Sequence, residues 1–397
     1  MKTNQLPPAL ILGGTTTALG FARSLGWKGI PVTVMAAFPE HPAMRSRTAR
    51  KVLSADPLDD PERCLEDILK WGRREGKKSV LIPTLEEFVK IVSDHRRELA
   101  EHFYFRLPSS GLVESLLDKE TQYSLMEKSG LSAPISVFSS GPDFVHRAID
   151  IVGFPCVIKP CSSHVWRQVP GRFKALEIVS ADELARAWKE LHPLGQKFLA
   201  QEKIPGGDEY LYSYLGYLGK GSVPIADLTA RKLRQQPAVY GSGSLIKSVE
   251  QEDILQMSRD ALKKAGYLGH VDVEYKWDIR NESWKIIETN IRSTSFVQLA
   301  VSSSIDLPWV GYLETLDQDQ PLLPRQRNDV LFMHIGWDLQ AALSEKKNAL
   351  SFVAWLRMLA KVRSFAILNW RDPLPFLAEV FLYIQKLSRM TQKRGMN

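Results

Sequence analysis

Cysteine is scarce in this chain of 397 residues, which contains only Cys64, Cys156 and Cys161. Their spacing matches neither a disulfide framework nor a metal-binding pattern. A reducing compartment is the simplest explanation, so we expect a cytoplasmic location. The chain also lacks any uninterrupted apolar run near the ~18 residues that a membrane-spanning helix requires. Its short apolar start leads into a Gly-Gly turn, which predicts a first strand and not a signal peptide.

Most of the chain lacks a charge excess of either sign. The net charge is +7, but residues 351–397 carry eight Lys and Arg against two Asp and Glu, so the first 350 residues are nearly neutral. A nucleic-acid-binding protein would present a basic face over its main body, and we therefore expect no nucleic-acid partner. The length suggests two to three domains, and a hydrophobic content of 44% is ordinary for a globular protein.

The first hundred residues alternate between two kinds of hydrophobic pattern. Strands are predicted at 8–14, 31–37 and 79–84, and helices at 15–29 and 61–76. Such alternation predicts a parallel α/β sheet. The glycine pair at the first turn lacks the G-x-G-x-x-G spacing of a dinucleotide fingerprint, so we interpret it as a plain tight turn.

The most informative segment is 271–292, VDVEYKWDIRNESWKIIETNIR, which predicts two short strands joined by a polar turn. Residues two apart on a strand face the same way, so Glu288 and Asn290 share a face, with Arg292 beyond them. Pairing across the turn allows Glu274 to join them. Two carboxylates and an amide oxygen suit Mg²⁺, and an Arg beside them can hold a phosphate or carboxylate. A surface hairpin with ordinary charges is the alternative for such a short motif.

Together with the segments upstream, this hairpin resembles the ATP-grasp superfamily, which includes biotin carboxylase, carbamoyl phosphate synthetase and the D-alanine ligases. The resemblance covers roughly residues 8–315. Through AQEKIPGGDEYLYSYLG, RKLRQQP and IETNIR it is closest to a branch of predicted ATP-dependent carboligases. It implies an α/β fold that begins with a Rossmann-like N-terminal domain (1–115) and continues with a two-part ATP-grasp domain (116–316). The two parts of that domain would be a small lid subdomain at about 135–200 and a large subdomain at about 201–316. A linker (317–329) and a basic, Trp-rich helical C-terminal cap region (330–397) would follow.

The resemblance also implies which residues form the site. Glu274, Glu288 and Asn290 match the metal ligands, and Arg292 matches the E-x-N-x-R ending that binds the acyl phosphate or its developing charge. The ATP-binding positions that match are Lys119 and Lys159 for the phosphates, Glu202, Lys203 and Ile204 for adenine, Glu209 or its neighbour Asp208 for ribose, and Arg231 or Lys232 for the triphosphate.

Two of these assignments also rest on physical arguments. Lys159 ends the apolar strand predicted at 154–160, where a buried charge needs a partner. An anionic phosphate is a natural partner, so we assign Lys159 a catalytic role beside Arg292. Arg231 and Lys232 are adjacent on a predicted strand and point to opposite faces, so only one of them is expected to face the triphosphate.

The segment expected to close over the phosphates, CSSHVWRQVPGRF at 161–173, departs from the family pattern. Many relatives have a glycine-rich loop there, whose backbone N–H groups cradle phosphate. This chain has only Gly171 in the segment. Any phosphate contact in the loop is therefore expected from Ser162, Ser163, His164 and Arg167.

The C-terminal region is rich in Trp, Phe and Leu and has two interpretations. Apolar residues at helical spacing, with cations between them, predict a helix within 351–368 and a second within 372–387. A helical cap packed on the core is the preferred interpretation, because apolar stripes are first of all core signals. A basic amphipathic helix can also lie on an anionic membrane, so a weak peripheral membrane contact stays open.

The function expected from the resemblance is an ATP-dependent carboxylate–amine ligase. Its cofactors would be ATP and Mg²⁺, with Mn²⁺ as an alternative metal, and its partners a small-molecule carboxylate and an amine; a homodimer stays open. The residues of the substrate pocket would come from the N-terminal domain, the loop at 84–87 and the stretch after Arg292. The alternative is a non-catalytic nucleotide-binding or membrane-peripheral scaffold that keeps the fold.

Overall fold

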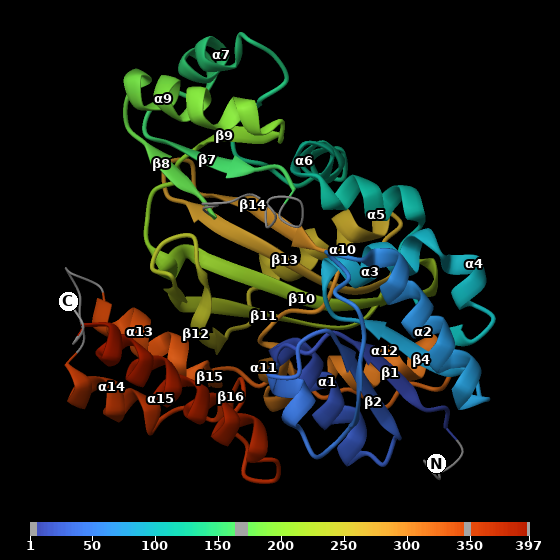
Figure 1. Ribbon diagram of the computed structural model, residues 1–397. Helices are drawn as coiled ribbons and strands as arrows, with labels where there is room; N and C mark the ends of the chain where they lie inside the picture. The colour runs from blue at the N-terminus through green and yellow to red at the C-terminus, as the bar shows by residue number, and fades with distance from the viewer. Residues whose placement is uncertain (1–5, 163–173, 345–350, 395–397) are drawn as a thin grey trace.

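The computed structural model describes residues 6–162, 174–344 and 351–394, which fold into three β-sheets with flanking helices (Figure 1). Most of the phosphate loop predicted at 161–173 lies outside the described residues, including Ser163, His164, Arg167 and Gly171. Within the described ranges, no helix is both long enough and apolar enough to cross a membrane.

The N-terminal part alternates strands and helices, as predicted. Its elements are β1 (Ala9–Leu12), α1 (Thr16–Trp27), β2 (Val32–Ala36), the 3₁₀ turn η2 (Pro42–Arg45), β3 (Arg50–Leu53), α2 (Pro61–Glu75), β4 (Ser79–Pro83), α3 (Glu86–Asp94), α4 (Arg96–Leu99) and β5 (Phe103–Tyr104). The strands pair in parallel in the order β3-β2-β1-β4-β5, which confirms the predicted parallel sheet. Helix α2 shows how local sequence sets the boundaries: Asp60 caps its start and the left-handed Gly76 ends it.

Two helices, α5 (Ser110–Leu117) and α6 (Lys119–Lys128), connect this part to the rest of the chain. The break between them occurs at Asp118, whose carboxylate accepts hydrogen bonds from the backbone N–H groups of Glu120 and Thr121. This N-cap fixes Lys119 as the first residue of α6.

The smallest sheet has four antiparallel strands in the order β6-β9-β7-β8. Its elements are β6 (Ser136–Phe138), α7 (Phe144–Ile151), β7 (Cys156–Pro160), β8 (Leu176–Ile178), α9 (Ala181–Leu191) and β9 (Phe198–Glu202). Helices α7 and α9 cover the face that points away from the rest of the molecule (Figure 1). Phe144, Leu184 and Phe198 belong to a core that this lobe does not share with the other sheets.

The largest sheet has seven strands in the order β14-β13-β10-β11-β12-β15-β16. Its first part contains β10 (Leu211–Gly219), β11 (Val223–Gln236), β12 (Ser242–Ser248), α10 (Glu252–Lys264), β13 (Gly269–Asp278), β14 (Ser283–Asn290), α11 (Val297–Ser302) and α12 (Leu307–Thr315). The predicted hairpin at 271–292 is therefore β13 and β14. Ala9, Phe21, Leu215 and Val297 belong to one core, so this sheet and the parallel sheet are packed as one body.

The C-terminal region contributes both strands and helices. Its elements are β15 (Leu331–Met333), α13 (Ile335–Ser344), α14 (Phe352–Leu359), β16 (Ser364–Phe365) and α15 (Leu374–Arg394). Strand β15 pairs with β12 and β16 pairs with β15, so the region extends the large sheet. The helix predicted within 351–368 is wrong beyond Leu359, because the following backbone forms sheet hydrogen bonds instead. The helix predicted within 372–387 is confirmed as the first part of α15.

Two fully buried aspartates fasten the C-terminal region to the rest of the molecule. Asp338 in α13 accepts hydrogen bonds from Arg234 Nε of β11 at 2.9 Å and from Trp355 Nε1 of α14 at 2.9 Å. Asp372 accepts a hydrogen bond from Arg23 Nε of α1 at 3.0 Å, and Arg23 is itself only 1% exposed. Because buried charges are tolerated only when they are paired, these contacts fix how the region docks.

Candidate active site

The register between β13 and β14 assembles the predicted acidic cluster. Glu274 is the direct partner of Glu288, and Asp272 is the direct partner of Asn290. Side chains of directly opposed residues lie on the same face of a sheet. The structure therefore brings Glu274, Glu288 and Asn290 together, as the strand alternation predicts.

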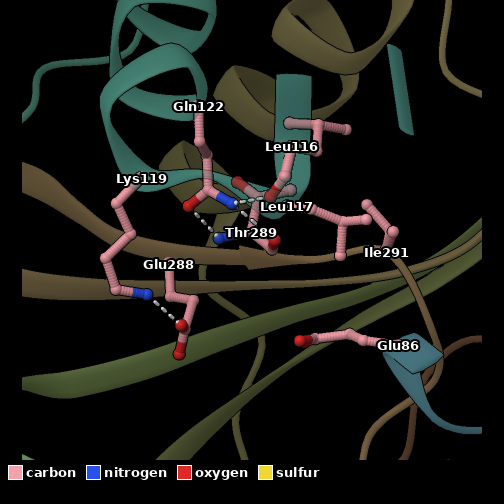
Figure 2. A pocket seen from close by; sticks show the side chains of 8 residues that line it. All are labelled: Glu86, Leu116, Leu117, Lys119, Gln122, Glu288, Thr289 and Ile291. Atoms are coloured by element: carbon pink, nitrogen blue, oxygen red, sulfur yellow. Dashed lines mark hydrogen bonds and ion pairs between the residues drawn. The ribbon is translucent and has the colours of Figure 1, made fainter. Parts of the chain in front are cut away.

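Glu288 is paired with a lysine from another element. Lys119 Nζ, at the start of α6, donates a hydrogen bond to Glu288 Oε1, and both side chains line a pocket (Figure 2). Burial alone would raise the pKa of Glu288, but the charge and hydrogen bond of Lys119 outweigh it and lower that pKa to about 2. Glu288 is therefore a carboxylate at neutral pH.

Glu274 is paired with a lysine from the neighbouring part of the sheet. Lys232 Nζ of β11, buried at 3% exposure, donates a hydrogen bond to Glu274 Oε2 at 2.6 Å. Arg231 points elsewhere: its Nε donates to the carbonyl oxygen of Glu209 at 2.7 Å, and its guanidinium lies over the ring of Tyr212. Of the two adjacent cations, only Lys232 contacts the acidic cluster, as alternation along β11 predicts.

Asp272 completes this cluster and was missed by the sequence analysis. Its Oδ2 accepts a hydrogen bond from Asn290 Nδ2 at 3.2 Å, whereas its buried Oδ1 has no hydrogen-bond partner among the described residues. Burial, followed by the nearby charge of Glu274, raises the pKa of Asp272 to about 7. The spacing that unites Glu288 and Asn290 also places Asp272 two residues from Glu274, so the same argument could have found it.

Lys159 reaches the site from β7 of the small sheet. Its Nζ donates a hydrogen bond to Gln201 Oε1 at 2.8 Å, and Gln201 Nε2 donates to Tyr123 Oη at 3.1 Å. Burial, together with the charge of Lys119, lowers the pKa of Lys159 to about 8, although Glu288 and Glu274 act in the opposite direction. A neutral amide thus holds this cation in place. No sequence signal identified Gln201.

Arg292 lies just past the end of β14 but remains beside the cluster. Its Nη2 is 3.5 Å from Asn290 Oδ1 and 3.7 Å from Glu86 Oε1. Glu86 is the first residue of α3 and belongs to the loop at 84–87 that was expected to line the substrate pocket. It lines the same pocket as Lys119 and Glu288 (Figure 2). Arg292 therefore stands between the acidic cluster and the N-terminal part.

A further cation near the cluster was not identified from the sequence. Lys174 is the first described residue after the predicted loop and is exposed. Desolvation lowers its pKa, while the charges of Glu274 and Glu288 oppose the shift. The acids of the cluster are thus surrounded by several cations. The acids are Asp272, Glu274 and Glu288, and the cations are Lys119, Lys159, Lys174, Lys232 and Arg292.

The residues expected around adenine lie at the end of β9. The Glu202 carboxylate accepts a hydrogen bond from the Ile135 N–H at 2.9 Å and pairs with Arg280. Lys203 pairs with Glu177 of β8, so both charged side chains are used within the protein. Backbone groups of this segment are then the groups suited to contact a base.

The backbone after β9 is also tied to the large sheet. The Ile204 carbonyl accepts a hydrogen bond from Lys276 Nζ at 2.9 Å. Of the two candidates for ribose, Asp208 accepts a hydrogen bond from Gln235 Nε2 at 2.7 Å, whereas the side chain of Glu209 is exposed. Glu209 is thus the more accessible carboxylate for a diol.

The donor set fits Mg²⁺. Glu274 and Glu288 offer carboxylate oxygens, Asn290 an amide oxygen, and Asp272 a buried oxygen without a hydrogen-bond partner in the described chain. These are the hard oxygen donors that Mg²⁺ prefers. No preformed group of three His, Cys, Asp or Glu side chains with metal-site geometry occurs among the described residues. Each lysine contacts one oxygen of its glutamate, Oε1 of Glu288 and Oε2 of Glu274.

The sequence has distant relatives among characterised enzymes. It is 26% identical over 237 residues to D-aspartate ligase of Enterococcus faecium, a match that covers 57% of this chain and 56% of the relative. It is 28% identical over 162 residues to formate-dependent phosphoribosylglycinamide formyltransferase of Salmonella paratyphi C, covering 41% of this chain and 37% of the relative. The matches thus span about half of these relatives or less. No protein-family model matches the chain.

Solved structures share the fold over most of the chain. N5-carboxyaminoimidazole synthetase of Staphylococcus aureus in complex with ADP aligns with a TM-score of 0.63 and 14% identity, covering 83% of this chain and 82% of that one. The biotin carboxylase domain of Hydrogenobacter thermophilus 2-oxoglutarate carboxylase, a dimer crystallised with MgADP, aligns with a TM-score of 0.65 and 14% identity over 82% and 74% of the two chains. The chain therefore shares the fold of these solved structures, in agreement with the predicted resemblance to the ATP-grasp superfamily.

Proposed function

We propose that this protein is a Mg²⁺- and ATP-dependent ligase that joins a small-molecule carboxylate to an amine. The observation that carries the proposal is the register of β13 and β14, which sets Glu274 opposite Glu288 and Asp272 opposite Asn290. Lys119 and Lys232 already contact the two glutamates. A non-catalytic protein would have no chemical need for such a set of oxygens and cations.

The nucleotide would span the two lobes that contribute these groups. Backbone atoms of Glu202, Lys203 and Ile204 would contact adenine, and the exposed Glu209 would accept the ribose hydroxyls. Lys119, Lys159 and Lys232 would bind the phosphates, since a triphosphate offers each lysine a stronger anionic partner than the neutral Gln201 amide or a single carboxylate. Glu274, Glu288 and Asn290 would hold Mg²⁺, which when bound supplies charge neutralisation between the phosphate oxygens.

The chemistry requires no nucleophile from the protein. One oxygen of the substrate carboxylate attacks the γ-phosphorus, the bond from that phosphorus to the bridging oxygen breaks, and ADP leaves. The amine then attacks the acyl carbon, the carbon–oxygen bond to phosphate breaks, and the amine loses a proton to solvent. Arg292 would stabilise the acyl phosphate through two parallel hydrogen bonds. The protein contributes positioning and electrostatic stabilisation, which are the main requirements of phosphoryl transfer.

A two-stage assay tests the proposal. Release of phosphate and ADP from ATP and Mg²⁺ is measured with pooled carboxylates and pooled amines, first separately and then together. A ligase should release phosphate at its full rate only when both pools are present, and mass spectrometry should then find the condensed product. Nucleotide binding without turnover in any pool would instead favour the non-catalytic scaffold, which keeps the ATP-grasp fold.

A further inference from the structure

The C-terminal helices expose large apolar side chains at positions where a surface that faces water ordinarily has polar residues. Leu377, Phe381 and Ile384 of α15 are 57%, 59% and 58% exposed, and Trp370, just before this helix, is 88% exposed. The other exposed large apolar side chains on α14 and α15 are Phe352, Val353 and Leu356 of α14 and Leu374, Val380 and Leu382 of α15. Contiguous apolar surface of this kind usually marks an interaction site.

The spacing on α15 shows that this exposure follows the helix geometry. Leu374, Leu377, Phe381 and Ile384 recur at intervals of three and four residues, which places them in one stripe. The opposite side of the helix packs inward, where Tyr383 lies against Gly336 of α13. Figure 1 shows α14 and α15 at the edge of the molecule. The helix therefore has apolar residues both on its inner side and in its outer stripe.

Charge is distributed unevenly over the same region. The exposed charged side chains among the described residues of 351–385 are the cations Arg357, Lys361, Arg363 and Arg371. The two acids of this segment face inward instead: Asp372 is fully buried against Arg23, and the Glu379 carboxylate lies 3.7 Å from His334 Nε2. Arg371 lies over the Trp27 ring of α1, and Arg357 lies on α14 itself. In the described part of 351–385 the exposed charged side chains are thus all cations, close in sequence to the exposed apolar residues.

We propose that the outer surface of α14 and α15 binds the interface of an anionic membrane. Apolar side chains of such helices insert at the boundary between headgroups and acyl chains, and each nearby Lys or Arg is attracted to anionic lipid. A second copy of the chain fits less well, because it would place cations against cations without an acid to offset them. This attachment is independent of the ligase chemistry and would hold the active site close to a membrane surface.

Vesicle flotation with the full-length protein tests the proposal. The vesicles contain either phosphatidylcholine alone or phosphatidylcholine with phosphatidylglycerol, at low and at high salt. The protein should float with the anionic vesicles, and its binding should fall at least about tenfold with the neutral vesicles or at high salt, where exposed charges are screened. The Leu377→Glu/Phe381→Glu variant should lose flotation to a similar extent. The control is Leu53→Glu on β3, where an equally exposed leucine lies outside this surface and flotation should persist.

Each other result contradicts the proposal. Absence of flotation with anionic vesicles overturns it, as does unchanged flotation of the Leu377→Glu/Phe381→Glu variant. A concentration-dependent dimer that this variant abolishes, without vesicle binding by the wild type, would assign the surface to a second copy. Equal melting temperatures of variant and wild type establish that any loss reflects the surface and not unfolding. Because the outer residues are not part of the core, we expect those temperatures to agree.

Discussion

The candidate active site and the outer surface of α14 and α15 are both rich in cations, but they differ in how those cations are balanced. In the site, Lys119 and Lys232 each contact a carboxylate of the same chain. On the outer surface, Arg357 and Lys361 are exposed while the acids of the segment are turned inward. Internal pairing suits a site that exchanges partners when an anionic ligand and a metal arrive. Exposed cations without neighbouring acids suit a surface that binds a separate, negatively charged partner.

The largest expected effect tests the paired side of this comparison. Glu288→Gln should reduce ATP turnover at least ~10²-fold, since removing one electrostatic contact to a transition state typically costs this much. The fold should persist because glutamine has the same shape and still accepts a hydrogen bond from Lys119. Steady-state phosphate release measures the effect, and Glu282→Gln in the exposed turn of the same hairpin is the control. Wild-type turnover by folded Glu288→Gln would remove the acidic cluster from the mechanism.

Arg292 distinguishes a ligase from a simple ATPase. Arg292→Lys keeps the charge but loses the planar fork that can bridge two oxygens of an acyl phosphate. Product formation should fall about 10- to 100-fold at saturating ATP, because an interaction made mainly in the transition state affects kcat more than binding. ATP affinity should stay near that of the wild type. Arg259 of α10 forms a pair with Asp227 of β11, and Arg259→Lys is the matched control. Equal product formation by both variants would make Arg292 a structural residue.

The lysines of the site should show a smaller effect, on binding. Lys119→Ala and Lys159→Ala should each weaken ATP binding about tenfold, equivalent to about 1.4 kcal/mol, because each loses one contact to phosphate. Adenosine affinity should change little, since neither lysine is expected near the base. Titration calorimetry with ATP and with adenosine separates the two contributions. Unchanged ATP affinity in both variants would mean that the lysines serve only to pair with Glu288 and Gln201.

Local patterns predict much of the site, and long-range contacts explain what they miss. Alternation along single strands predicted that Glu288 and Asn290 share a face and that Arg231 and Lys232 point to opposite faces. The same alternation places Asp272, two residues before Glu274, on the face of the acidic cluster. Gln201 could not be found this way, because its role depends on β9 lying between β7 and β6 in a sheet of distant segments. A glutamine on a buried strand has no distinctive spacing.

The C-terminal region shows the corresponding limit for the fold. Helical spacing correctly predicted α14 and the first part of α15, but the helix expected to continue past Leu359 is interrupted. The interruption is imposed by β15, which offers a sheet edge to Ser364–Phe365. That edge exists only after β12 has paired with β15. Tertiary pairing thus overrides a periodic sequence.

The smallest predicted effect sharpens the contrast between paired and unbalanced charge. Glu379 is one of the two acids turned inward, near His334 of the chain segment before α13 and near Tyr383 on its own helix. Burial raises the pKa of Glu379 to about 7 and lowers the pKa of His334 to about 4. In the unfolded chain a glutamate has a pKa near 4.3 and a histidine near 6.5.

The sign of the effect follows from these values. Between about pH 4.3 and 7 the folded protein holds a proton on Glu379 that the unfolded chain releases, so stability falls as pH rises through this interval. The loss of stability from His334 occurs at the acidic end, as pH falls below about 6.5. From pH 6 to 8 the two contributions therefore oppose each other: stability gained from His334 offsets part of the loss from Glu379. The Glu379 contribution alone should amount to about 1 kcal/mol, because the partly exposed carboxyl is screened by solvent.

Glu379→Gln removes this titration while keeping the shape of the side chain. The His334 contribution is common to both proteins, so the wild type should lose about 1 kcal/mol relative to the variant between pH 6 and 8, and at pH 8 the variant should be the more stable of the two. Thermal unfolding across this interval measures the difference, with Glu75→Gln at the end of α2 as a control that follows the wild type. The opposite outcome is that the wild type gains stability from pH 6 to 8 and Glu379→Gln does not. Glu379 would then be ionised and favourably paired in the folded protein. In that case one acid would offset part of the positive charge on the C-terminal region.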